Sequence, residues 1–153
     1  PVTGAMAENG GVYFPLHAAP ELLVDIPDLV AHRQQLRAAF GQLQQRWPQL
    51  HESDDNRFRL TDWTFDIKGL SEADLEAMAN VCHTLDWGFT YSTVQCHLFK
   101  PGQSKATGLL QVLQRHFAPI TPAEVITLGD SPNDESLFDP TLFPHSVGVG
   151  NVK

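Results

Sequence analysis

The sequence predicts an α/β fold, in which part of a doubly wound, Rossmann-like sheet is combined with a separate α+β unit. Two features of the chain carry this prediction. Toward the C-terminus, a helical segment is followed by a short apolar strand, a short helix and a second strand, which is the order of a parallel sheet. In the middle of the chain the predicted order is helix, strand, helix and then a strand or hairpin, which is typical of an inserted α+β unit.

The first predicted elements are a hairpin and a long helix. Residues 5–14 are expected to form strand, turn and strand, because Asn9-Gly10 is a strong hairpin signal. A helix is predicted from Pro27 to about Trp47, since proline suits the first helical turn and Pro48 ends the pattern. Its apolar residues fall near one face, which we expect to be buried: Leu29, Val30, Leu36, Phe40 and Leu43.

The middle of the chain continues with a loop, a strand, a helix and a hairpin. Residues 51–59 are polar and indicate a loop or irregular strand, whereas 60–68 alternate between apolar and polar residues and indicate a strand. The segment 71–74 resembles a capping box, so a helix is expected from there to about Leu85. Residues 89–99 are rich in β-branched and aromatic side chains, which favour one bent strand or a hairpin.

The C-terminal third is predicted to begin after a loop at 101–102. A helix is expected over 104–117, followed by a short buried strand at 125–129. A short helix near 133–138 and a last strand near 146–149 complete the chain.

Loops at 13–16 and 100–103 are the predicted domain boundaries. Residues 1–14 and 100–153 would then form the doubly wound part, and residues 15–99 the inserted α+β unit.

Composition limits the classes of function. The 153 residues are 42% hydrophobic and 18% charged, which favours a folded protein, and the net charge is −8. An acidic chain argues against a broad nucleic-acid or anionic-membrane surface, but it leaves room for a small anionic ligand. No apolar run approaches the roughly 18 residues of a membrane span. Cys82 and Cys96 are not in CxxC spacing and indicate reduced thiols in a cytoplasmic protein.

A magnesium site is predicted after the strand at 125–129. Asp130 and Asp134 follow this apolar run, and ligands in open α/β sheets bind outside the carboxyl ends of strands. Carboxylate oxygens are ligands that Mg²⁺ prefers, so Asp130 is expected to bind it directly and Asp134 directly or through a water. Asn133 and Ser131 would support the cluster. The alternative is a helix N-cap with an acidic residue in the first turn.

Lys105 is the candidate for phosphate binding. It follows Ser104 at the start of a predicted helix, where a cation opposes the helix dipole and an anion is attracted. A lysine there is explained if it binds a phosphate or neutralises the carboxylates near Asp130; the alternative is an exposed lysine without a role. Asn9 and Arg57 are further substrate-binding candidates. Their alternatives are an ordinary turn residue and a solvated loop residue.

Two segments resemble a known family. SKATGLLQVLQ at 104–114 and EVITLGDSPNDESLF at 124–138 resemble the third and fourth motifs of the haloacid dehalogenase-like phosphatases. The similarity is greatest to the branch with a cap inserted between the second and third motifs, which includes the Cof-type and sucrose-phosphate phosphatases. AENGG at 7–11, Tyr91-Ser92 and SVGVGNV at 146–152 also resemble that branch.

The resemblance implies an activity and assigns roles. It implies Mg²⁺-dependent hydrolysis of a small phosphomonoester, with a sugar phosphate as the expected substrate, through an aspartyl-phosphate intermediate. Lys105 would stabilise the phosphate and the nucleophile, and Asp130 would hold Mg²⁺ with support from Asp134 and Asn133. Residues 15–99 would be the cap that selects the substrate, inserted in a core domain made of the rest.

The nucleophile of that family lies in a DxDGT-like motif, which residues 1–153 do not contain. The one loosely similar string, Asp62-Trp-Thr-Phe-Asp66, lies within the expected cap. The resemblance therefore implies that the chain is a fragment, inactive by itself, whose nucleophile lies outside it.

Two other interpretations stay open at this point. One is the phosphorylation domain of a cation-pumping ATPase, which shares a GD-x-x-ND string; the small inserted unit and the lack of a membrane segment count against it. The other is a non-catalytic module that binds a phosphorylated metabolite or a protein partner. The expected partner is a small phosphorylated substrate, with no nucleic acid and no membrane; the sequence predicts no oligomeric state.

Overall fold

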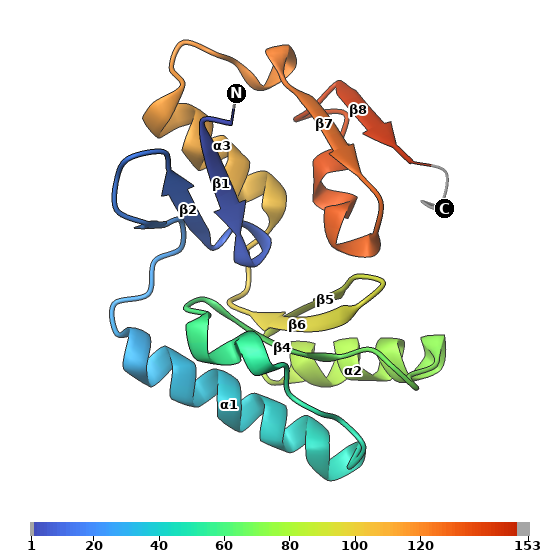
Figure 1. The fold of residues 1–153 in the computed structure, drawn as a ribbon. Helices are drawn as coiled ribbons and strands as arrows, with labels where there is room; N and C mark the ends of the chain where they lie inside the picture. The colour runs from blue at the N-terminus through green and yellow to red at the C-terminus, as the bar shows by residue number, and fades with distance from the viewer. Residues whose placement is uncertain (1, 150–153) are drawn as a thin grey trace. The chain divides into compact units, whose positions relative to one another are not determined.

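The computed structural model describes residues 2–149, and contacts within the chain divide it into two compact units (Figure 1). Unit 1 contains the chain up to Val24 and from Gln103 onward, and unit 2 contains Asp25–Gly102. The first boundary lies further along the chain than the predicted loop at 13–16, because a short strand at Glu21–Leu22 pairs within unit 1. The interpretation of the two units as core and cap domains stays a prediction.

Unit 1 combines a small antiparallel sheet, one helix and a pair of parallel strands. Strands β1, β2 and β3 pair in that order, and β7 pairs with β8 in parallel. The elements are β1 (Gly4–Ala7), the 3-10 helix η1 (Glu8–Gly10), β2 (Val12–Pro15), β3 (Glu21–Leu22), α3 (Lys105–His116), η3 (Pro122–Glu124), β7 (Ile126–Gly129), η4 (Pro132–Phe138) and β8 (His145–Gly148). The predicted hairpin, helix and parallel strands are confirmed, and the expected short helix is the 3-10 helix η4. The prediction that the strand at 125–129 is buried is wrong, because Ile126 is 66% exposed and Leu128 64%, and only Thr127 of β7 is buried.

The apolar interior of unit 1 consists of two small clusters on helix α3. In one, Val112 packs with Tyr13 and Leu23 from the N-terminal part of the chain. In the other, Ala106 packs with Leu137 and Phe143, which come from η4 and the segment after it. Helix α3 therefore connects the hairpin to the parallel strands. The end of the predicted SVGVGNV segment, residues 150–152, lies outside the described residues.

Unit 2 is a three-stranded antiparallel sheet, in the order β4-β6-β5, with two helices. Its elements are α1 (Leu29–Arg46), the 3-10 helix η2 (Asp54–Phe58), β4 (Asp62–Asp66), α2 (Glu72–Thr84), β5 (Gly88–Tyr91) and β6 (Gln95–Phe99). Figure 1 shows both helices lying along the same face of the sheet. The core of unit 2, formed by these helices and the sheet, includes Phe40, Phe65, Met78 and Leu98. Of the two alternatives for residues 89–99, the hairpin is correct.

Helix α1 differs from its prediction in two details. Asp28 caps the helix by accepting a hydrogen bond from the Ala31 backbone N–H at 3.0 Å, so Pro27 precedes the helix instead of occupying its first turn. Val30, expected on the buried face, is 68% exposed, whereas His32 is buried. Leu36, Phe40 and Leu43 are buried as expected: Leu36 0% exposed, Phe40 3% and Leu43 0%. The predicted buried face is therefore correct from Leu36 onward and wrong at Val30 in the first turn.

Strand β4 is buried on both faces, although its sequence alternates between apolar and polar residues. Trp63 and Phe65 are buried, and so are Asp62 and Thr64 between them. Asn56 in η2 brings this about. Its amide donates to the Thr64 carbonyl and accepts from the Thr64 N–H, at 2.7 and 2.9 Å. Among residues 2–149, no helix is long and apolar enough to span a membrane.

Candidate functional site

Three segments of unit 1 meet at the carboxyl end of β7. They are the turn η1, the first turn of α3, and the loop from Gly129 to Asp134 that leads into η4. Each is connected to the next by side-chain hydrogen bonds. One of the two roles that the sequence offered for Lys105 was to neutralise the carboxylates near Asp130, and the structure brings Lys105 into contact with Asp134 of that loop.

Lys105 occupies the first position of helix α3 because Ser104 caps that helix. The Ser104 hydroxyl accepts a hydrogen bond from the Thr107 N–H at 3.0 Å, and the Ser104 N–H donates to the Thr107 hydroxyl at 2.9 Å. This reciprocal capping box fixes where the helix starts. The Lys105 Nζ donates to Oδ1 of Asp134, and the lysine side chain remains 24% exposed.

Asp134 is the best-connected acidic residue of the site, and it is only 5% exposed. Its Oδ1 faces Lys105, and its Oδ2 accepts from the backbone N–H groups of Asp130 and Ser131 at 3.0 and 3.2 Å. Because Asp134 is the third residue of η4, it also caps that helix together with Ser131. The carboxylate therefore fixes both the lysine and the loop after β7.

The environment of Asp134 keeps it ionised. Burial alone would raise the pKa of this carboxyl, but the hydrogen bond and positive charge of Lys105, with the two loop amides, outweigh burial. The resulting pKa lies below its ordinary value of 3.8. An ionised Asp134 beside a lysine ammonium is the charge state that anchors Lys105 at neutral pH.

Asp130 is placed differently, because its side chain is exposed. Within residues 2–149 its carboxylate has one hydrogen-bonding neighbour, the Ser131 hydroxyl, which lies 3.1 Å from Oδ1. Most of its lone pairs are therefore available. An exposed carboxylate at the end of a strand suits Mg²⁺, which keeps several waters and needs few protein ligands.

The donor set fits Mg²⁺ with Asp130 as the direct ligand. Asp134 already accepts hydrogen bonds from Lys105 and from two backbone amides, so it fits the expected contact through a water better than direct ligation. Over residues 2–149, no group of three or more His, Cys, Asp or Glu side chains gathers into a metal cage. A cation at this position would thus depend on Asp130, water and a bound substrate.

Ser131 and Asn133 form hydrogen bonds within the loop from Gly129 to Asp134, and Asn133 also joins this loop to the turn η1. The Ser131 hydroxyl lies 2.7 Å from Oδ1 of Asn133. The Asn133 amide in turn donates to Oδ1 of Asn9 at 3.4 Å. The predicted candidates Asn9, Asn133 and Ser131 therefore share one network with the loop that carries Asp130.

Glycine makes the close approach of these segments possible. A methyl group at Gly129 would overlap the side chain of Asp134, and one at Gly10 would overlap the backbone carbonyl of Ser104. Ser136, which sequence reasoning missed, adds a contact by accepting from the Ala106 N–H at 3.2 Å. Its hydroxyl lies 30 positions from its partner, so local spacing gave no signal for it.

Arg57 belongs to unit 2, where it is exposed in η2 with its guanidinium 4.7 Å from the Phe58 ring centroid. The arginine that binds carboxylates there is Arg59. It contacts Asp55 at 2.8 Å and the fully buried Asp62 at 2.9 Å. His97 also approaches Asp62, at 3.0 Å. No local pattern in the sequence indicates this network, since its members come from η2, the residue after it, β4 and β6.

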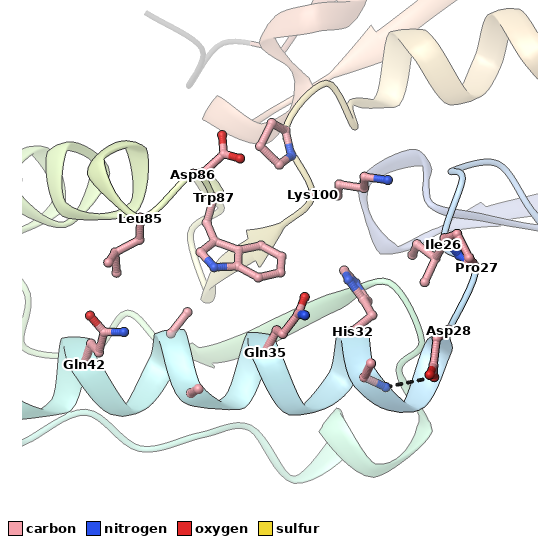
Figure 2. A pocket seen from close by; sticks show the side chains of 14 residues that line it. Ile26, Pro27, Asp28, His32, Gln35, Gln42, Leu85, Asp86, Trp87 and Lys100 are labelled. Atoms are coloured by element: carbon pink, nitrogen blue, oxygen red, sulfur yellow. Dashed lines mark hydrogen bonds between the residues drawn. The ribbon is translucent and has the colours of Figure 1, made fainter.

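A cavity of about 690 Å³ lies within unit 2 (Figure 2). Figure 2 shows the ring of Trp87 on one side and His32 and Gln35 of α1 on the other. Asp86 and Lys100 also line it. None of the predicted site residues is among its lining, so the cavity gives those predictions no support.

This chain is similar in sequence to two phosphoglycolate phosphatases. A phosphoglycolate phosphatase of Haloarcula marismortui is 32% identical over 155 aligned residues, which cover 96% of this chain and 60% of the relative. A phosphoglycolate phosphatase of Methanothrix thermoacetophila is 29% identical over 147 residues, which cover 94% of this chain and 58% of the relative. The chain thus spans about three fifths of the length of these relatives.

A solved structure has the same fold. The sucrose-phosphatase from Synechocystis, in complex with sucrose and phosphate, aligns with a TM-score of 0.62 at 14% identity, covering 95% of this chain and 58% of that one. This likeness confirms the predicted fold class and says nothing more. The family model for haloacid dehalogenase-like hydrolases matches residues 32–153, a span that includes parts of both units. Since this match covers most of its length, the chain belongs to the haloacid dehalogenase-like hydrolase family.

Proposed function

We propose that the whole protein is a Mg²⁺-dependent phosphatase that hydrolyses a small phosphomonoester. One observation carries the proposal: Lys105 is held against a buried, ionised Asp134 beside the exposed carboxylate of Asp130. A fixed ammonium next to a carboxylate with free lone pairs is an arrangement that suits a phosphate and a hard cation. Membership of the family and the names of the two curated relatives support the same activity.

Each residue of the site has a role in this proposal. An ammonium group has three N–H bonds and Asp134 takes one, so Lys105 keeps two that can donate to phosphoryl oxygens. Asp134 orients Lys105 and the loop, while Asp130 would bind Mg²⁺ with Asn133 and Ser131 in support. A bound Mg²⁺ supplies positive charge that polarises the phosphoryl group.

The nucleophile is proposed to be an aspartate outside residues 1–153. Asp62, in the string that loosely resembles a nucleophile motif, is fully buried. Arg59 and His97 bind its carboxylate. A carboxylate so enclosed is unavailable for attack on a substrate. The Asp62 carboxylate serves instead to hold Arg59 and His97 together within unit 2.

Two substrate classes are proposed for the test. A sugar phosphate is the class that the sequence resemblance implies. Phosphoglycolate is favoured by the names of both curated relatives. Unit 2 and Arg57 are proposed to contribute to this selection. A cytoplasmic location is also proposed, and the free thiols of Cys82 and Cys96 agree with it.

The experiment measures phosphate release by the whole protein from phosphoglycolate and a panel of sugar phosphates, with Mg²⁺ and with EDTA. We expect activity only with Mg²⁺. Asp130→Asn should lower the rate by about 10²-fold or more, because a carboxylate that holds the cation is removed. Glu76→Gln is the matched control, since it makes the same change at an exposed position of helix α2 and should keep full activity.

The outcomes separate the alternatives. Unchanged turnover in Asp130→Asn would contradict the metal assignment. If the wild type binds inorganic phosphate but releases none from any substrate, the protein is the non-catalytic module that the sequence left open.

A further inference from the structure

The side chain of Asn9 in unit 1 has an unused hydrogen-bond donor. Asn9 is only 8% exposed, and its Nδ2 is buried without a partner in the described part of the chain. Its other amide atom, Oδ1, accepts from Asn133 at 3.4 Å. Buried amide donors are nearly always satisfied in native proteins, so an unsatisfied one calls for an acceptor from a water, an ion or a ligand.

The backbone holds this side chain in place. Asn9 has a φ of 51° and ψ of 41°, in the left-handed region, where Asn is among the few tolerated residues. The turn is fastened to the segment before α3, because the Gln103 amide donates to the Glu8 carbonyl at 2.6 Å. Gly10 lies directly against the Ser104 carbonyl. Asn9 therefore has little freedom to turn its amide toward another partner.

The position of Asn9 indicates which ligand supplies the acceptor. Asn133, its partner, belongs to the loop between Asp130 and Asp134, and the turn of Asn9 packs on the end of α3 that presents Lys105. The turn that carries Asn9 thus lies against the N-terminus of α3, whose first residue is Lys105, and a helix N-terminus and an ammonium both attract anions. The carboxylates of Asp130 and Asp134 belong to the same loop, and Asp134 pairs with Lys105. An anion with several oxygens satisfies Lys105 and the Asn9 amide at once.

We propose that the Nδ2 group of Asn9 donates a hydrogen bond to an oxygen of the phosphoryl group that Lys105 binds. This inference rests on the proposed function and adds a neutral donor to its phosphate site. Free inorganic phosphate has the same oxygens as a substrate phosphoryl group, so it serves as the probe.

The test measures binding of inorganic phosphate to the whole protein by calorimetry, with Mg²⁺ present. Asn9→Gly removes the amide while keeping a residue suited to the left-handed turn. It should weaken binding by about tenfold, the usual effect of losing one hydrogen bond to a charged group. Asn9→Asp should weaken binding further, because a carboxylate oxygen replaces the donor and repels phosphate.

Asp86→Gly is the matched control, since Asp86 is an exposed residue with φ of 59° in unit 2. It should bind phosphate like the wild type. Thermal unfolding without phosphate separates binding from structure: Asn9→Gly should unfold at about the same temperature as the wild type, because removal of the unsatisfied buried donor offsets loss of the long hydrogen bond from Asn133.

The results distinguish this inference from the function on which it depends. If the wild type binds phosphate and Asn9→Gly binds it equally well, the role of Asn9 is overturned and the proposed function stands. A lower unfolding temperature with unchanged affinity would show a purely structural residue. If the wild type binds no phosphate, the proposed function and this inference fail together.

Discussion

Asp134 shows how one side chain can serve both the structure and the site. Its carboxylate faces an ammonium on one oxygen and two backbone amides on the other. The sequence predicted that Asp130 binds Mg²⁺ directly and that Asp134 does so directly or through a water. The structure separates them, because Asp134 is buried and occupied while Asp130 is exposed. We therefore expect substitutions at the two positions to have different consequences.

Asp134→Asn should lower the free energy of unfolding by about 1–3 kcal/mol at pH 7, because a charge-assisted hydrogen bond to Lys105 is lost in a largely buried place. Asp130→Asn, at an exposed position, should change it by less than about 0.5 kcal/mol. Urea unfolding of both variants beside the wild type measures the difference.

The effect of Asp134 should also depend on pH. Its pKa in the folded protein lies below 3.8, the ordinary value that the unfolded chain has. The stability that its charge contributes is therefore present above that ordinary value and is lost as the pH falls through the lowered folded value. The gap between wild type and Asp134→Asn should shrink below about pH 4. A gap that is equally large at pH 7 and at pH 3 would show that the charge of Asp134 is unimportant.

At the level of elements, the contact between α3 and the turn η1 positions Lys105 and Asn9. Gly108 of α3 is the point of closest approach, because a methyl group there would overlap the Cα and carbonyl oxygen of Gly10. The overlap is with backbone atoms, which cannot rotate away. Gly41 in α1 offers a contrast, since no described atom lies within 4 Å of a methyl group at that position.

Gly108→Ala should therefore destabilise the protein by about 1–3 kcal/mol, as overpacking does, although alanine is the better helix former. Gly41→Ala should stabilise it by about 0.5–1 kcal/mol, because only the helix propensity changes there. Chemical denaturation of the two variants checks both signs. If both substitutions stabilise the protein, the packing of α3 on η1 is looser than described.

Elements with local signals were predictable from the sequence. Caps and prolines placed α1 and α3 to within a few residues, and Asn9-Gly10 placed the first hairpin. Burial decided by distant residues was not predictable. Asp62 is buried because Arg59 pairs with its carboxylate and the ring of His97, 35 positions away, contacts it at 3.0 Å. The partner of Lys105 among the two aspartates was likewise undecided, because a spacing of four residues does not say which carboxylate turns inward.

In the whole molecule, the two units differ in how the chain builds them. Unit 2 is one continuous stretch, 25–102, and one core cluster joins its helices and sheet. Unit 1 needs two stretches that lie far apart in the sequence. A continuous stretch with its own core meets the usual criterion for independent folding.

Residues 25–102 expressed alone should therefore unfold in one cooperative transition in urea. The three tryptophans, Trp47, Trp63 and Trp87, all lie in this stretch, so their fluorescence reports on it directly. A gradual change in fluorescence, without a cooperative midpoint, would show that unit 2 depends on the rest of the chain.

The split course of unit 1 has a consequence for biosynthesis. The hairpin of β1 and β2 leaves the ribosome before Val112, on which Tyr13 and Leu23 pack and which is translated about ninety to a hundred residues later. During that interval unit 2 can complete its own core, while Tyr13 and Leu23 still lack the helix on which they pack. We therefore expect chaperones that bind nascent chains to recognise the segment 4–24, and to release it when helix α3 emerges.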